Sequence, residues 1–136
     1  MKKYIHVAFM YAIAAMAGGV FYREFTKWSG YADTTVLGKI HTHLFLLGMV
    51  VFLLVALFAG SMKLEQEKMF RVFLGVYNVG VLLTAVMMAV RGIAQVKAVE
   101  LSRRADAAIS GVAGIGHILI GTGLVLLLLS LRKQAK

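Results

Sequence analysis

Three histidines are the residues of this sequence best suited to chemistry. His41 and His43 lie two residues apart at the start of an apolar run, and His117 lies near the start of another. A neutral imidazole is a common ligand of iron, copper and zinc. Ionisable residues inside apolar spans are usually functional, so these three point to a metal or haem site. The fourth histidine, His6, is expected to be an interfacial polar residue without a ligand role.

Glycines flank His41 and His117 at helical spacing. Residues three, four or seven positions away share a face of an α-helix with the residue between them. Both imidazoles would therefore stand beside bare backbone, which leaves room for a flat, bulky ligand. The four glycines are Gly38, Gly48, Gly114 and Gly121.

His41 and His43 point in different directions on a regular helix. At about 100° per residue their side chains are roughly 200° apart, so they cannot both bind one metal ion. The face of His41 carries the glycines and two phenylalanines, whereas the face of His43 carries Lys39 and Leu47. We therefore expect His41 to face the interior and to pair with His117, with His43 as the substitute ligand.

The elements that must position these histidines are membrane-spanning helices. Hydrophobic residues make up 60% of the 136-residue chain, the mean hydropathy is +0.83, and there is no proline or cysteine. Four stretches reach the length of about 20 mostly apolar residues that a helix needs to cross a bilayer. They are residues 4–22, 38–60, 70–92 and 111–131. The sequence therefore predicts an all-α, four-helix integral membrane bundle, a single domain over residues 1–136.

The third span has no obvious stop. No glycine or proline follows Gly92 until Gly111. Because nothing breaks the helical pattern, the helix is expected to continue out of the membrane through Lys97 and Arg103.

Basic residues lie in short loops at both membrane faces. The formal net charge is +9, and attraction to anionic lipid headgroups accounts for it without nucleic-acid binding. Four spans put both termini on one side of a cell membrane, and the basic N-terminus favours the cytoplasmic side. All six acidic residues lie in loops or at helix ends, which argues against carboxylate-driven proton antiport. Hydrolytic and phosphoryl-transfer motifs are missing, so an enzyme is the less favoured class.

The histidines, glycines and basic residues together fit haem b with two histidine ligands. Such a site needs imidazoles on facing helices, space for the macrocycle and cations near its propionates. His41 and His117 supply the imidazoles. The candidate cations are Arg23, Arg91, Lys39 and Arg103. With both axial positions filled, the expected role is electron transfer or sensing of redox state or gases, and a quinone is one candidate redox partner.

Two other interpretations stay open. A metal ion could be held by His41 or His43 together with His117 and Glu24, with methionines as further ligands if the metal were copper. Alternatively, the chain could be a structural or accessory membrane subunit without a cofactor, whose histidines only make polar contacts.

Three motifs carry a resemblance over essentially the whole chain. They are Phe21–Lys27, His41–Gly48 and Gly114–His117. With these motifs the sequence resembles the small bacterial membrane proteins grouped as domain of unknown function 2871. That resemblance implies a membrane protein and no particular activity.

The segment that begins at His41 is also similar, over about a dozen residues, to a helix of the haem-copper oxidase catalytic subunit that carries a low-spin haem ligand. This resemblance implies a haem ligand at His41, with His117 as its counterpart. The three further histidines of a copper centre and the cross-linked His-Tyr pattern are missing, so a complete haem-copper site is not implied. Because that subunit consists of three four-helix arcs around a pseudo-threefold axis, the resemblance implies a homo-oligomer, specifically a trimer.

Overall fold

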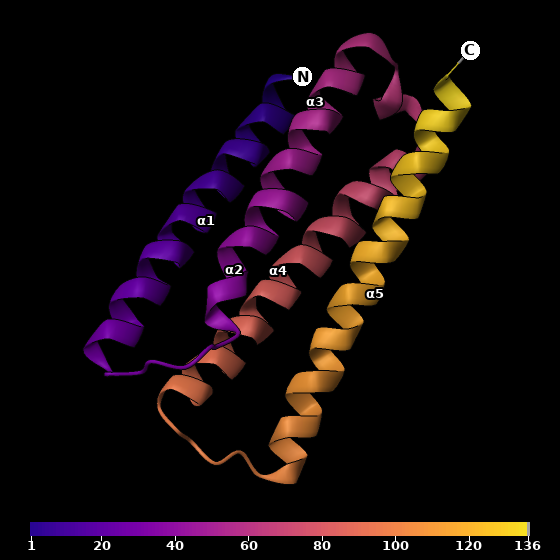
Figure 1. The fold of residues 1–136 in the computed structure, drawn as a ribbon. Helices are drawn as coiled ribbons and strands as arrows, with labels where there is room; N and C mark the ends of the chain where they lie inside the picture. Colours follow the sequence, from indigo (N-terminus) through magenta and orange to yellow (C-terminus); the bar gives the residue numbers. More distant parts are fainter. Residues whose placement is uncertain (136) are drawn as a thin grey trace.

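The computed structural model describes residues 1–135 as four long helical rods joined by short loops (Figure 1). In chain order the elements are α1 (Lys2–Trp28), α2 (Leu37–His43), the π-helical segment η1 (Leu44–Val50), α3 (Val51–Ser61), the 3-10 turn η2 (Leu64–Gln66), α4 (Lys68–Val96) and α5 (Arg103–Gln134). Each of the four predicted spans lies inside one rod. The prediction of an all-α chain with four helices long and apolar enough to cross a membrane is therefore confirmed.

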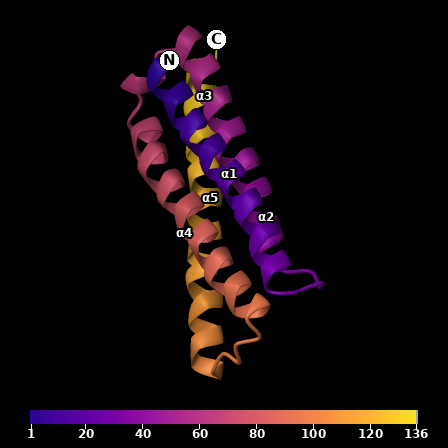
Figure 2. The same ribbon diagram turned by 90° about the vertical axis from the view of Figure 1, so that its left-hand side faces the viewer.

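The second rod is continuous from α2 through η1 to α3. It packs along α1, while α4 packs along α5, and α2 and η1 also contact α4. Both chain termini lie at one end of the bundle, and the α1–α2 and α4–α5 loops lie at the other (Figure 1). We call the second end the loop end, defined by residues 29–36 and 97–102. The α4–α5 hairpin extends beyond the α1–α2 loop there in both views (Figures 1 and 2).

Glycines let α4 and α5 touch backbone to backbone. A Cβ at Gly80 would lie 2.8 Å from Ile120 N and 2.9 Å from Gly116 O, and a Cβ at Gly116 would overlap the Thr84 hydroxyl. In lipid, close van der Waals contact replaces the hydrophobic effect as the force that joins helices. The pairing of α4 with α5 therefore depends on the absence of side chains at these two positions.

An aromatic cluster fills the core on the side of the termini. Its members with essentially no exposed surface are Phe52, Phe70, Phe73 and Tyr77. The rings of Phe73 and Tyr77 are 5.1 Å apart, and Phe52 stacks on Tyr11 at 5.8 Å. Such pairs contribute about 0.5–1.5 kcal/mol each beyond the burial of their surface. The cluster thus joins α3 and α4 to α1.

Ion pairs tie both termini to the loop between α3 and α4. Lys3 Nζ lies 2.9 Å from Glu65 Oε1, and Lys133 Nζ lies 2.7 Å from Glu67 Oε2. Hydrogen bonding to the two lysines lowers the pKa of Glu65 and of Glu67 below their usual range. Each tie is therefore present at neutral pH and is lost as the pH falls through the lowered pKa of its carboxylate.

The helix of the third span ends earlier than the sequence predicts. Val96 is the last residue of α4, and Ala98 takes a left-handed φ of 50°. The N–H of Val99 then donates to Ala94 O at 3.0 Å, a helix ending in which glycine is the usual left-handed residue. The expectation of a helix through Lys97 and Arg103 is therefore wrong. The left-handed backbone conformation of Ala98 ends the helix, and no sequence pattern predicts that conformation for an alanine.

Replacing Gly116 by alanine should destabilise the bundle, because the new Cβ would collide with Thr84 and with the backbone of α4. We expect a loss of about 1–3 kcal/mol in the free energy of unfolding, measured by SDS titration in mixed micelles. Gly114→Ala is the matched control on the same helix, because nothing lies within 4 Å of the added Cβ. Equal losses in the two variants would contradict this packing.

Candidate functional site

The structure places the imidazoles of His43 and His117 beside each other. His43 is the last residue of α2, and His117 lies in α5. Their ring centroids are 6.5 Å apart, with an angle of 87° between the ring planes. Two imidazoles on opposite sides of a metal ion, each nitrogen about 2.0–2.1 Å from it, have centroids roughly 6.3 Å apart. The observed separation is therefore of the size that two imidazole ligands of one metal ion would have.

Each of these rings is held by a backbone carbonyl one turn earlier in its own helix. His43 Nδ1 lies 3.0 Å from Lys39 O, and His117 Nδ1 lies 2.8 Å from Ala113 O. A carbonyl oxygen only accepts, so Nδ1 of each ring donates its proton, and Nε2 of the neutral ring keeps its lone pair. Metal-binding histidines commonly have this arrangement, in which the second nitrogen is fixed by a carbonyl.

The two rings line a groove between α2, α4 and α5, which we call the histidine groove. Its volume is about 340 Å³. Apolar side chains and two thioethers make most of its wall, and two cations and a hydroxyl complete it. The lining residues are Val36, Lys39, His43, Met87, Met88, Arg91, Ile109, Ser110, Ala113 and His117.

Arg91 is the better fixed of the two cations in the histidine groove. Its Nη2 atom donates to Asp106 Oδ1 and to Ser110 Oγ, each at 2.8 Å. This arginine therefore links the end of α4 to the start of α5. Lys39 is exposed and forms no ion pair with the part of the chain that the structure describes. The groove thus has two cationic side chains on the side of the loop end, of which Arg91 is paired with Asp106 and Lys39 is not paired with any described residue.

A pair of hydrogen bonds fastens the start of α2 to the end of α4. Thr35 Oγ1 and the N–H of Val36 both donate to Gln95 Oε1, at 2.9 and 3.0 Å. Beside them, a Cβ at Gly92 would lie 2.7 Å from Leu37 N, so the two helices are in close contact. This junction holds α2, and with it His43, against α4. No signal in the sequence marks Gln95 for this role, because polar residues are common at helix ends.

His41 lies on the other side of its helix, against α1. A Cβ at Gly19 would stand 3.6 Å from His41 Cβ. The Nδ1 atom of His41 is buried, and no described residue forms a hydrogen bond with it. From the sequence we expected His41 beside His117. The structure places the ring of His43 there, because the face of the helix that carries His41 packs against α1.

The glycines near His41 leave no open slot for a ligand. A Cβ at Gly48 would overlap the ring of Tyr11, and a Cβ at Gly38 would lie 3.1 Å from Tyr22 Cζ. Both tyrosines belong to α1. The room that the sequence analysis assigned to these two glycines is therefore taken up by helix packing.

The glycines near His117 are open, but on the outer surface of the bundle. Nothing lies within 4 Å of a Cβ built at Gly114 or Gly121, and His117 itself is exposed. The glycines that pack against α4 are Gly116 and Gly123, on another face of α5. The space that the glycine spacing around His117 predicted is therefore present, and it lies on the outer surface of the bundle.

The remaining candidate residues lie away from the histidine groove. Arg23 is exposed on α1 and does not line the groove. Within residues 1–135, no three side chains of the histidine, cysteine, aspartate and glutamate types come together as a metal-binding group. The alternative site made of two histidines and Glu24 is therefore not assembled in the structure.

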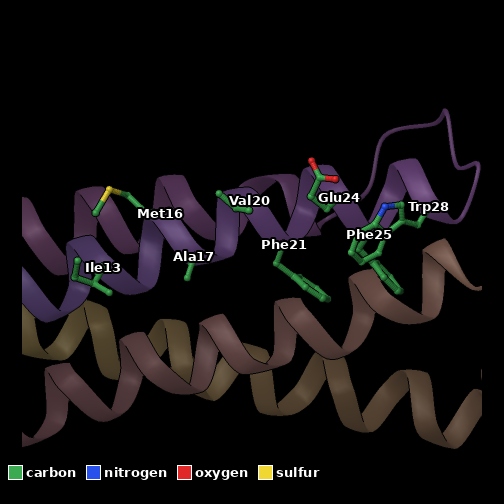
Figure 3. Close-up of a pocket in the computed structure, with 8 residues that line it drawn as sticks. All are labelled: Ile13, Met16, Ala17, Val20, Phe21, Glu24, Phe25 and Trp28. Carbon is green, nitrogen blue, oxygen red and sulfur yellow. The ribbon is translucent and has the colours of Figure 1, made fainter.

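Glu24 belongs instead to a shallow groove along α1. Figure 3 shows that all the side chains lining this groove come from that one helix. They are Ile13, Met16, Ala17, Val20, Phe21, Glu24, Phe25 and Trp28. Its surface is almost entirely apolar, which suits contact with lipid.

Comparison with known proteins assigns this chain to a family. The family model described as "Protein of unknown function (DUF2871)" matches residues 1–134. The chain belongs to the DUF2871 family. Searches of curated proteins and of solved structures gave no significant match. Membership confirms the resemblance drawn from the three motifs, while nothing in these comparisons supports the one to haem-copper oxidases. All residues of the histidine groove of this DUF2871 protein lie within the matched region.

The hydrogen bonds of His43 and His117 predict their tautomers. In ¹⁵N spectra of the histidine-labelled, cofactor-free protein, recorded at a pH where the rings are neutral, both should carry the proton on Nδ1. His6 is the control, because it is exposed and should show the tautomer mixture of a free side chain. Protonation of Nε2 in His43 and His117 would contradict the arrangement.

Proposed function

We propose that this protein binds haem b within the membrane through Nε2 of His43 and of His117, and that it transfers electrons or senses redox state or gases. The observation that carries the proposal is the pair of rings, 6.5 Å apart and each held through Nδ1 by a carbonyl of its own helix. This pairing fixes the direction of both rings and leaves both acceptor nitrogens free.

The number of protein ligands favours haem over a bare metal ion. Structural zinc sites usually have four protein ligands and catalytic ones three, whereas the described residues bring only two histidines together. Haem supplies an iron that already has four nitrogen ligands and changes its oxidation state, so two imidazoles complete the coordination.

The other residues of the histidine groove have roles that suit this ligand. Val36, Met87 and Met88 would contact the apolar macrocycle and exclude water from it. Arg91 and Lys39 would pair with the propionates on the side of the loop end. Arg23, which the sequence analysis also proposed for this role, does not line the groove.

Occupation of both axial positions by protein disfavours substrate turnover at the iron. Electron transfer and redox sensing need no open coordination position, whereas gas sensing would require one histidine to dissociate. A quinone as redox partner, a homotrimer and cytoplasmic termini stay predictions that rest on the sequence alone.

The competing function is that of a structural or accessory membrane subunit without a cofactor. The observation in its favour is that both Nδ1 atoms already have hydrogen-bond partners, so the rings form polar contacts without any ligand. Such a protein would be colourless when purified, even after expression with added haem.

Alanine substitutions of the histidines test the haem site. Purified wild-type protein should show a low-spin b-type spectrum with about one haem per chain, in both the air-oxidised and the dithionite-reduced state. His43→Ala and His117→Ala should each lose the low-spin spectrum and retain haem at least about tenfold more weakly, because one axial ligand is gone.

His6→Ala and His41→Ala are the controls, and both should keep the wild-type spectrum. Loss of the spectrum in His41→Ala together with its retention in His43→Ala would favour the pair expected from the sequence. An unchanged spectrum in both His43→Ala and His117→Ala would refute the proposal.

A further inference from the structure

Tyr77 lies between the two helices that carry the paired histidines. It belongs to α4 and is fully buried. Its hydroxyl donates to Leu47 O in η1 at 2.8 Å. On its other side, a Cβ at Gly123 of α5 would lie 2.8 Å from Tyr77 Cβ, so this tyrosine also touches the helix of His117. One side chain thus contacts both histidine-bearing rods.

The carbonyl that Tyr77 binds belongs to an irregular part of its helix. In a π-helical segment the backbone N–H groups donate to the carbonyl five residues earlier rather than four, so the α-helical pairing of the carbonyls is interrupted in η1. An unpaired carbonyl is costly in the hydrocarbon interior, where no water replaces the lost donor. The hydroxyl of Tyr77 supplies a donor at this position and so compensates for the irregularity.

The π-helical segment η1 changes the direction of the side chains that precede it. A π turn contains about one more residue than an α turn, which rotates the flanking segments relative to each other by roughly 100°. His43 immediately precedes η1 and faces His117 of α5. Phe52 follows η1 and stacks on Tyr11 of α1 at 5.8 Å. The segment therefore lets one rod present different residues to α1 and to α5.

We propose that Tyr77 is a positioning residue for the histidine pair: through its hydrogen bond to Leu47 O it stabilises η1 and thereby sets the direction in which His43 faces His117. The importance of that direction for a ligand rests on the proposed haem function. The geometric part concerns the protein alone and can be tested without haem.

Tyr77→Phe removes the hydroxyl and keeps the ring, so it tests this hydrogen bond specifically. The chain has no cysteine, so nitroxide labels can be attached at Thr42→Cys and Ile118→Cys, both exposed positions. In haem-free protein, Tyr77→Phe should shift the label-to-label distance by roughly 5 Å. The reason is that α2 would rotate about its own axis, and a side chain lies roughly 5 Å from the axis of its helix. Electron-electron double resonance measures this distance.

Tyr11→Phe is the matched control. The hydroxyl of Tyr11 donates to Asn78 Oδ1 at 2.6 Å, so this variant also loses a phenol hydrogen bond in the core without changing the donor to Leu47 O. It should leave the label distance unchanged. A distance unchanged in Tyr77→Phe, or shifted equally in Tyr11→Phe, would overturn the inference.

Deletion of Leu46 tests the same idea without touching Tyr77. This residue lies within η1, and its side chain is 62% exposed, so its loss should convert the π segment to an α-helix and shift the label distance as Tyr77→Phe does. If Tyr77→Phe fails to fold, the deletion decides the inference by the same distance, and no shift overturns it.

In haem-loaded protein, Tyr77→Phe should alter the low-spin electron paramagnetic resonance signal and the midpoint potential while haem stays bound, and Tyr11→Phe should alter neither. A wild-type protein without haem whose label distance still shifts in Tyr77→Phe would refute the proposed function and leave the positioning role intact. A wild-type protein with haem and no change in Tyr77→Phe would refute the positioning role alone.

Discussion

The backbone contact between α4 and α5 is the constraint on which the rest of the arrangement depends. Gly80 and Gly116 meet with no room for a side chain, and this contact fixes both the separation and the rotation of the two helices. His117 follows Gly116 directly, so its side chain points about 100° away from the contact, toward the edge of α5 rather than into α4. The histidine groove exists at that edge because α2 is fastened to α4 at the loop end.

The rod that carries His41 and His43 contacts α1 on one side and faces α5 on another. On one side α1 packs tightly, with the rings of Tyr11 and Tyr22 filling the gaps at the glycines. On the other side the rod must present a side chain toward α5. A straight α-helix with His-x-His sends the two rings in nearly opposite directions, and the structure uses both: His41 meets α1 and His43 meets His117. The π segment that follows changes the rotation of α2, and so of both histidines, relative to α3.

The sequence predicts the elements of this fold much better than their rotation. Spans follow from hydropathy, because lipid requires about 20 apolar residues with internal hydrogen bonds. Glycine spacing predicted room for a ligand beside His117. In the structure Gly114 and Gly121 are open, while Gly116 and Gly123 make the contact with α4. A helix of a membrane protein is apolar on all sides, so periodicity does not reveal which face is inside. The left-handed turn at Ala98 and the π segment η1 are likewise products of tertiary contacts, for which no local residue pattern exists.

The histidine pair can be understood from the free-energy cost of placing polar atoms without hydrogen-bond partners in a membrane. An imidazole placed in hydrocarbon needs a partner for its N–H and another for its lone pair. The helices themselves supply the first, since Lys39 O and Ala113 O accept from the two Nδ1 atoms. No described residue donates to Nε2 of either ring. The two rings lie side by side, with centroids 6.5 Å apart, so one electron-pair acceptor bound by both Nε2 atoms would satisfy both lone pairs. The haem iron of the proposed function would be an acceptor of this kind.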